Sequence, residues 1–297
     1  MDVLRRLGRL GAVAVLAAAA VVTVPEVALT FETAATIRTK INLAGRQRML
    51  SQRMAKAACL MHQNVKPEEA AASLRGDFDL FAKTIHALRA GDPALNLMVE
   101  ENKAVLRYLE ITRKDWTPYS LVVRQALDRG AVSEADLQVI AERSNSVLKK
   151  MDTTVRRMAR TYGAKAGIRE DARAINWAGA QRMLTQRMAK DLCFIAAGVG
   201  VDVARFELGA NAMLFEERLA VLRQGDPAQK VAAPVNDAVR RHLDDVAAGW
   251  SPIADKLKAV SAGVTPDTAA LAELVSVLDA LLRSSHLAVQ AMEQVEG

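Results

Sequence analysis

The sequence predicts an all-α protein made of two tandem antiparallel four-helix bundles that form an internal pseudo-dimer. Helix-forming residues dominate the 297-residue chain, which has only 8 prolines and 16 glycines. No stretch alternates apolar and polar residues with the two-residue period of a strand. The third observation is a repeat: INLAGRQRMLSQRMAK (41–56) returns as INWAGAQRMLTQRMAK (175–190). The repeat sets the architecture, because duplicated segments mark duplicated structural units.

Residues 1–30 have the features of a targeting segment. Arg5, Arg6 and Arg9 form a positive region ahead of the apolar stretch LGAVAVLAAAAVVTV (10–24). Such a stretch suits a signal peptide and is short for a helix that spans a bilayer. We therefore predict a signal peptide or an N-terminal membrane anchor at 1–30, with the rest of the chain in the periplasm.

The repeat divides the remaining chain into two domains, 31–164 and 165–297. Placing Ile41 on Ile175 without gaps gives what we call the repeat alignment, in which most of 41–60 is identical to 175–194. The same alignment superposes the GDP at 91–93 on the GDP at 225–227, and the Trp and Pro at 116 and 118 on those at 250 and 252. One structural unit therefore occurs twice.

Four helices are expected in the first domain. The first covers about 32–63, and Pro67 suits the first position of a second helix that ends before Gly91. Asp92 can cap a third helix, in which Pro118 removes a backbone donor, so we expect a kink or an interruption there. Ser133 caps a fourth helix that runs to about 162.

The second domain carries the same boundary signals. They are Gly200, the GDP at 225–227, Pro252 and the Thr-Pro at 265–266. Short turns join helices that lie antiparallel, so each domain is predicted to be a four-helix bundle.

The repeated helix has two faces with different expected partners. A Leu/Met stripe that includes Leu50 and Met54 suits the interior of its own bundle. The opposite face, which we call the seam, follows a 4-3-4-3-4 spacing and contains small residues that allow close backbone approach. The seam residues are Ile41, Gly45, Arg48, Gln52, Ala55 and Cys59, with Ile175, Gly179, Arg182, Gln186, Ala189 and Cys193 in the second copy. We expect the two seams to pack against each other about an approximate two-fold axis.

Two arginines on this seam suggest an anion site. Arg48 and Arg182 would face each other, and two buried guanidiniums repel unless a negative group lies between them. A planar oxyanion can accept forked hydrogen bonds from both, and the two seam glutamines can add amide donors. The alternative is that each arginine pairs with a carboxylate or extends to water. The candidate anion-binding residues are Arg48, Arg182, Gly45, Gly179, Gln52 and Gln186.

Cys59 and Cys193 occupy matching seam positions and leave two possibilities. In an oxidising compartment they can form a disulfide, and otherwise they pack as two small buried thiols. The four histidines share no ligand spacing with them, so we expect no metal site.

Composition and motifs exclude several functions. The net charge of +6 is spread without a Lys/Arg block, and aromatic residues make up 4% of the chain, so we expect no nucleic-acid partner. Glycine-rich phosphate loops, nucleophile elbows and Ser/His/Asp arrangements are missing from the sequence, so we expect neither catalytic residues nor a cofactor.

The repeated motif resembles the P-box helix of NarX/NarQ-type nitrate-sensing histidine kinases, in their periplasmic sensor domain. It is similar as well to the PilJ-type N-terminal domain of type IV pilus chemotaxis transducers. The resemblance implies a dimerising antiparallel four-helix bundle that holds nitrate or nitrite with the arginine before the first motif Met. That arginine is Arg48 here and Arg182 in the second copy, and two fused domains let one chain supply both halves.

Some features of the chain depart from the resemblance. No second apolar stretch of spanning length and no output domain are found, and Gln52 and Gln186 stand where nitrate sensors tend to have another polar or aromatic residue. We expect a periplasmic anion sensor, for nitrate or nitrite, that signals to a membrane-bound partner. The alternative is a helical interaction module of a pilus or chemotaxis-type system that binds no small ligand.

Overall fold

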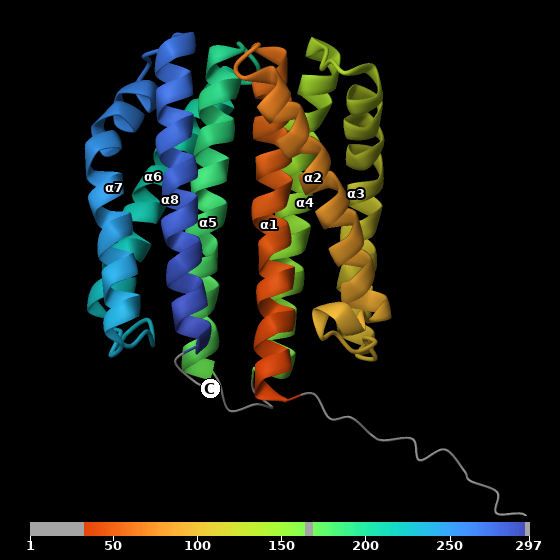
Figure 1. The fold of residues 1–297 in the computed structure, drawn as a ribbon, viewed down its shortest axis with the longest axis vertical. Coiled ribbons are helices and arrows are strands. Elements are labelled where there is room, and N and C mark those ends of the chain that lie inside the picture. Colours follow the sequence, from red (N-terminus) through yellow and green to blue (C-terminus); the bar gives the residue numbers. More distant parts are fainter. Residues whose placement is uncertain (1–32, 164–168, 295–297) are drawn as a thin grey trace, which may run out of the picture. The chain divides into compact units, whose positions relative to one another are not determined.

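The computed structural model describes residues 33–163 and 169–294, and all regular structure in these ranges is helical. Eight α-helices follow in order, with one short 3-10 helix (Figure 1). They are α1 (Ala34–His62), α2 (Pro67–Ala90), η1 (Pro93–Leu95), α3 (Lys103–Arg129), α4 (Glu134–Tyr162), α5 (Arg169–Ala196), α6 (Val201–Gln224), α7 (Asp237–Ser261) and α8 (Thr268–Gln294). The predicted leader at 1–30 and the predicted boundary at 164–165 lie outside the described residues.

Helices α1–α4 form one bundle and α5–α8 form a second, as the sequence predicts. Within each bundle the first helix packs against the second and the fourth, and the third packs against the fourth. The two bundles meet through α1 and α5, which lie side by side in Figure 1. The all-helical fold and the pairing of the two repeated helices are therefore confirmed.

The third helix differs from its prediction at both the start and the middle. Pro93 opens only η1, in which Asp92 Oδ1 accepts a 2.9 Å hydrogen bond from the Ala94 amide, and α3 begins further along the chain, capped by Asn102. The helix then continues through Pro118. The carbonyl that loses its partner belongs to the exposed Lys114, where water can satisfy it, so the interruption that we expected does not occur.

The two GDP segments form matching loops. Each is closed by an isolated bridge, Asp92 with Leu97 and Asp226 with Val231. Gly91 and Gly225 both have φ of 78°, which favours glycine, and a Cβ at Gly225 would lie 2.6 Å from the Ala233 nitrogen. Glycine is therefore required at both helix ends for conformation and for space.

Each bundle has an aromatic centre at the repeated tryptophan. The Trp116 ring stacks on Phe81 with centroids 4.2 Å apart, and Trp250 lies 4.5 Å from Phe215 in the second bundle. The Leu/Met stripe of the repeated helix is buried as well, with Leu50 and Met54 fully enclosed. The aromatic contacts join α2 to α3 and α6 to α7, while the buried Leu/Met stripe packs α1 into its own bundle and leaves the seam face to meet α5.

A disulfide joins the two bundles. Cys59 and Cys193 are bonded, and their Cα atoms are 6.1 Å apart. Both side chains are fully buried on the seam.

None of the helices in the described part of the chain has the length and apolar character needed to span a membrane.

The disulfide predicts a large loss of stability on its removal. Replacing both cysteines by alanine should lower the free energy of unfolding by about 4–5 kcal/mol, because a cross-link between such distant parts of the chain restricts the unfolded state strongly. Equilibrium unfolding in urea measures this change. Equal stability of the oxidised protein and the double variant would show that the packing of α1 on α5 is sufficient alone.

Candidate functional site

The two seam arginines are held by a reciprocal pair of hydrogen bonds between the bundles. Arg48 Nη2 donates to Asn176 Oδ1 at 2.8 Å, and Arg182 Nη2 donates to Asn42 Oδ1 at 2.6 Å. The repeat alignment relates both the arginines and the asparagines, so the two contacts follow the approximate two-fold axis. Each arginine is only 3% exposed, so it is removed from water as well as bonded across the seam.

The guanidiniums converge on one glycine. A Cβ built on Gly179 would lie 3.4 Å from Arg182 Nη2 and 4.0 Å from Arg48 Nη2. A Cβ on Gly45 would lie 3.3 Å from Arg48 Nη2. The seam glycines therefore provide the space that the arginine heads occupy, and the structure brings four of the predicted site residues together.

The two halves of the site differ at one position on the fourth helices. Arg48 Nη1 forms a 2.8 Å ion pair with Asp152 of α4, whose side chain is 34% exposed. The repeat alignment places Asp152 on His286 of α8, and Arg182 Nη1 lies 3.2 Å from His286 Nδ1. Carboxylate pairing, the alternative considered from the sequence, is therefore present at Arg48, whereas an imidazole occupies the same place beside Arg182.

Positive charges surround this pair. Burial lowers the pKa of Arg48, and Asp152 opposes that shift. Burial, with added repulsion from Arg48, lowers the pKa of Arg218 on α6. The pKa of His286 is lowered by burial and by the charges of Arg182 and Arg46. A neutral His286 can therefore accept a hydrogen bond from Arg182 at Nδ1.

The predicted glutamines face elsewhere. Gln52 Nε2 donates to the Ser144 carbonyl of α4 at 3.0 Å, and Gln186 Nε2 donates to Asp279 of α8 at 2.9 Å. Both amides are thus bonded to the fourth helix of their own bundle. The helical projection placed both glutamines on the seam but did not identify these neighbours, which already accept hydrogen bonds from the amides.

A second polar level lies about two turns along the seam. Lys56 Nζ contacts Asp279 of α8 at 2.7 and 2.9 Å, and Lys190 Nζ donates to Asn145 of α4 at 3.0 Å. The repeat alignment again relates the two pairs, and this position on the fourth helix is again acidic in one half only. The acids near Lys190 come from other positions, Asp191 at 3.1 Å and Glu207 at 3.6 Å. Burial lowers the pKa of Lys56, and Asp279 opposes that shift.

Sequence reasoning missed the partners of the arginines and lysines. The two asparagines could have been found, because they follow the first isoleucine in both copies of the motif. Asp152 and Asp279 lie on the fourth helices, where the two copies have diverged and the alignment is loose. Whether these residues reach the seam depends on which turn of α4 or α8 packs beside it. The pattern of a single helix in the sequence does not give that relative height.

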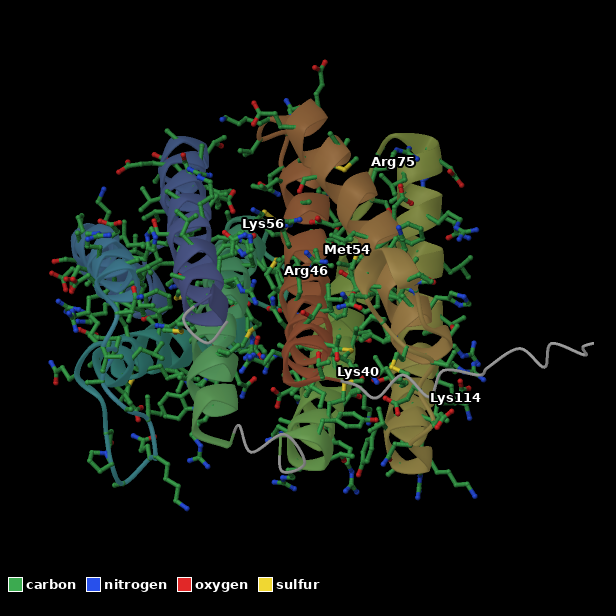
Figure 2. All side chains as sticks on the ribbon, turned by 60° about the horizontal axis from the view of Figure 1, so that its bottom comes forward. Lys40, Arg46, Met54, Lys56, Arg75 and Lys114 are labelled. Atoms are coloured by element: carbon green, nitrogen blue, oxygen red, sulfur yellow. A yellow bond between two sulfur atoms is a disulfide. The ribbon has the colours of Figure 1, made fainter. Side chains whose placement is uncertain are left out.

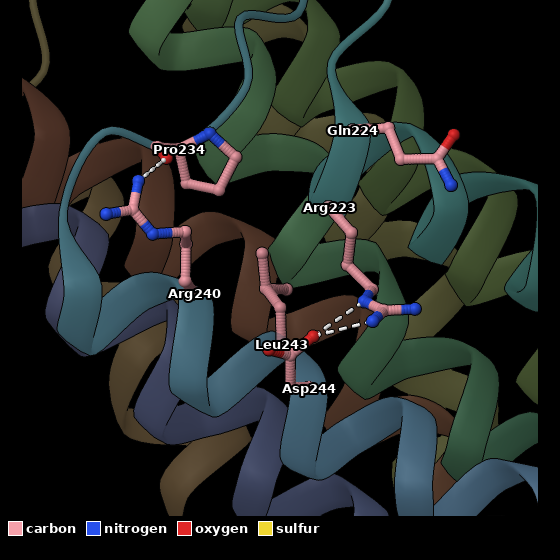
Figure 3. A pocket seen from close by; sticks show the side chains of 6 residues that line it. All are labelled: Arg223, Gln224, Pro234, Arg240, Leu243 and Asp244. Carbon is pink, nitrogen blue, oxygen red and sulfur yellow. Dashed lines mark hydrogen bonds and ion pairs between the residues drawn. The ribbon is translucent and has the colours of Figure 1, made fainter.

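A cavity of about 150 Å³ in the second bundle carries no comparable arrangement (Figure 3). Arg223 donates to Asp244 at 2.9 Å, and Arg240 donates to the Pro234 carbonyl at 2.8 Å. Its arginines are thus bonded to neighbours in α7 and the preceding loop. Among the described residues, the α1–α5 contact holds four buried cations, Arg48, Lys56, Arg182 and Lys190.

The fold and the seam define a class: a duplicated helical-bundle module with buried cations between its halves. A family model, Type IV pili methyl-accepting chemotaxis transducer N-term, matches residues 38–142 and 166–283. The matched stretches cover more than half of the chain, so the chain belongs to this family. No curated protein matches it. The match supports the PilJ-type part of the resemblance and identifies a sensory helical module of a signalling family rather than an enzyme family.

A buried carboxylate beside Lys190 generates a prediction on pH. Burial raises the pKa of Asp191 to about 6, although Lys190 opposes the shift. The folded state then holds this proton more tightly than the unfolded state, so this group's contribution to stability falls as pH rises from about 4 to about 6. The free energy of unfolding, measured with urea at several pH values in this range, should therefore fall less steeply with pH in Asp191→Asn than in the wild type. An unchanged pH dependence in the variant would contradict the assignment.

Proposed function

We propose that the protein is a periplasmic anion sensor that holds nitrate or nitrite between α1 and α5 and signals its presence to a membrane-bound partner. The observation that carries this proposal is the convergence of Arg48 and Arg182 on the space beside Gly179. Two guanidiniums from different bundles offer the planar, forked donors that match a small oxyanion. The resemblance to nitrate-sensing P-box helices supports the choice of anion.

The site is suited to a small anion for reasons of geometry and charge. The guanidiniums are held by neutral asparagine oxygens from the opposite bundle, which orient them without cancelling their charge. Buried cations bind an anion strongly because water competes poorly there. A bound anion would contact both bundles at once.

Signalling would follow from a change in how the bundles pack. An anion that bonds both arginines favours whichever arrangement of α1 and α5 brings them closest, and this shifts the population toward that arrangement. Cys59 and Cys193 lie about three turns from the arginines and keep the helices together there. Movement would therefore be larger at the arginine level than beside the disulfide.

The interaction-module alternative has one observation in its favour. Arg48 already pairs with Asp152 inside its own bundle, which is what a residue that only fixes helix packing would do. In that case the seam would bind no small anion, and the module would act through its outer surfaces. The two functions differ in one measurable property, the response to nitrate.

Nitrate or nitrite should raise the melting temperature of the purified chain, whereas chloride and sulfate should not. The expected stabilisation is about 2.7 kcal/mol at a ligand concentration about 100 times Kd. Arg48→Ala and Arg182→Ala should abolish the shift. Arg75→Ala, which removes one exposed charge from α2, should keep it. No response to any small oxyanion would favour the interaction module.

A glycine variant separates binding from stability. Gly179→Ala places a methyl group in ordinary contact with both guanidiniums, so the fold should tolerate it, and helix propensity should add up to about 1 kcal/mol. The same methyl group fills the space that we assign to the anion. A more stable variant that has lost the nitrate response is the expected result.

The difference between the halves predicts opposite effects of two substitutions. His286→Asp should weaken nitrate binding about tenfold, or about 1.4 kcal/mol, because the new carboxylate would compete for Arg182 as Asp152 does for Arg48. Asp152→Asn should tighten binding by removing that competition. Titration calorimetry measures both, and two changes of the same sign would contradict the proposed site.

A further inference from the structure

A cavity of about 290 Å³ lies between the two bundles, away from the arginine pair. Helices α1 and α2 of the first bundle and α8 of the second line it. Its lining includes Lys56, Ala57, Leu60, Ser73, Asp279 and Arg283. Figure 2 shows Lys56 on the side of α1 that faces α8, where its ion pair with Asp279 joins the bundles.

The corresponding place in the second half is occupied by larger side chains. The repeat alignment places Ala57 on Asp191, Leu60 on Phe194 and Ser73 on Glu207. Asp191 and Phe194 are buried there. The cavity beside α1 therefore results from three smaller residues at positions that the second half fills.

The second half also shows what chemistry this place accepts. The Glu207 carboxylate lies 2.8 Å from Arg187 Nη2, 3.6 Å from Lys190 Nζ and 3.3 Å from Asn145 Nδ2. Lys56 is the counterpart of Lys190, but Ser73 supplies no carboxylate. A carboxylate group is thus built into one half of the protein and missing from the same place in the other.

The lining matches a short amphipathic ligand. Ala57 and Leu60 are buried apolar residues, and Val65 extends the same surface. The Lys56 side chain is 6% exposed and is a strong donor, while Arg283 is exposed at the edge. Asp279 accepts hydrogen bonds from Lys56 and Gln186, and its side chain is still 32% exposed where it lines the cavity.

We propose that this cavity binds a small aliphatic carboxylate, whose carboxylate group takes the place that Glu207 fills in the second half. The carboxylate contacts Lys56 and Arg283, and the aliphatic chain lies on Ala57 and Leu60. The source is either a simple short-chain acid or an α-amino acid, whose ammonium group would contact Asp279. Such a ligand bridges α1 and α8, and the proposal does not depend on anion binding at Arg48 and Arg182.

Titration calorimetry of the full chain tests this proposal with four probes: butyrate, 2-aminobutyrate, 1-butanol and butylammonium. Butyrate or 2-aminobutyrate should bind, and the tighter of the two identifies the source. The alcohol and the amine should not bind, because they lack the carboxylate. Absence of binding by both carboxylates, or binding of butylammonium alone, would overturn the proposal.

Ser73→Glu supplies the missing carboxylate and should lower the affinity for the carboxylate probe at least about tenfold. Ser73→Leu fills the cavity without a charge and should do the same. Ala72→Glu adds the same charge to the exposed neighbouring residue and should leave binding within about twofold of wild type. All three should keep the response to nitrate, if the arginine site has one. Unchanged carboxylate binding in both Ser73 variants, with helical circular dichroism retained, would place the ligand elsewhere and refute the cavity.

Discussion

The burial of positive charge on α1 and α5 is the constraint on which the rest of the structure depends. A buried guanidinium or ammonium is costly unless it is hydrogen-bonded, and here each half supplies partners to the cations of the other. Asn42 and Asn176 bond the opposite arginines, and Asp279 and Asn145 bond the opposite lysines. These contacts fix the register of the two helices, because a slip by one turn would separate every pair. The bundles are thus joined by specific polar contacts and a disulfide as well as by apolar packing.

Duplication within one chain lets the two halves differ in a way that identical subunits do not allow. At the arginine level the acid is Asp152 on α4, and its counterpart is His286. At the lysine level the acid is Asp279 on α8, and its counterpart is Asn145. Each level therefore has a carboxylate at one of these two related positions and a neutral side chain at the other. The result is two related but unequal environments on either side of the approximate axis.

The sequence contained enough information for the fold and for part of the candidate site. A duplicated helix with a 4-3-4-3-4 seam predicts the α1–α5 contact, and it places Arg48 and Arg182 on it. Helix starts were harder, because Pro93 satisfies the local signals of a helix start, yet the chain turns back to pair Asp92 with Leu97. Gln52 and Gln186 show a second limit. A helical projection gives the direction of a side chain but not the height of the neighbouring helix, so it could not show that their amides meet α4 and α8.

The position of the disulfide bears on how such a module can transmit a signal. A cross-link at Cys59 and Cys193 prevents α1 and α5 from separating at one level. The lysine level lies about one turn from the disulfide, and the arginine level about three turns. A small change in the crossing angle of α1 and α5 therefore displaces the helices more at the arginine level than at the lysine level. Both α1 and α5 begin beyond the arginines, and the chain enters each bundle there. A ligand that changed the separation of the guanidiniums would therefore act near the middle of both helices, about three turns from the cross-link. Under the proposed function, the cross-link would favour a change in the angle between α1 and α5 over a separation of the whole bundles.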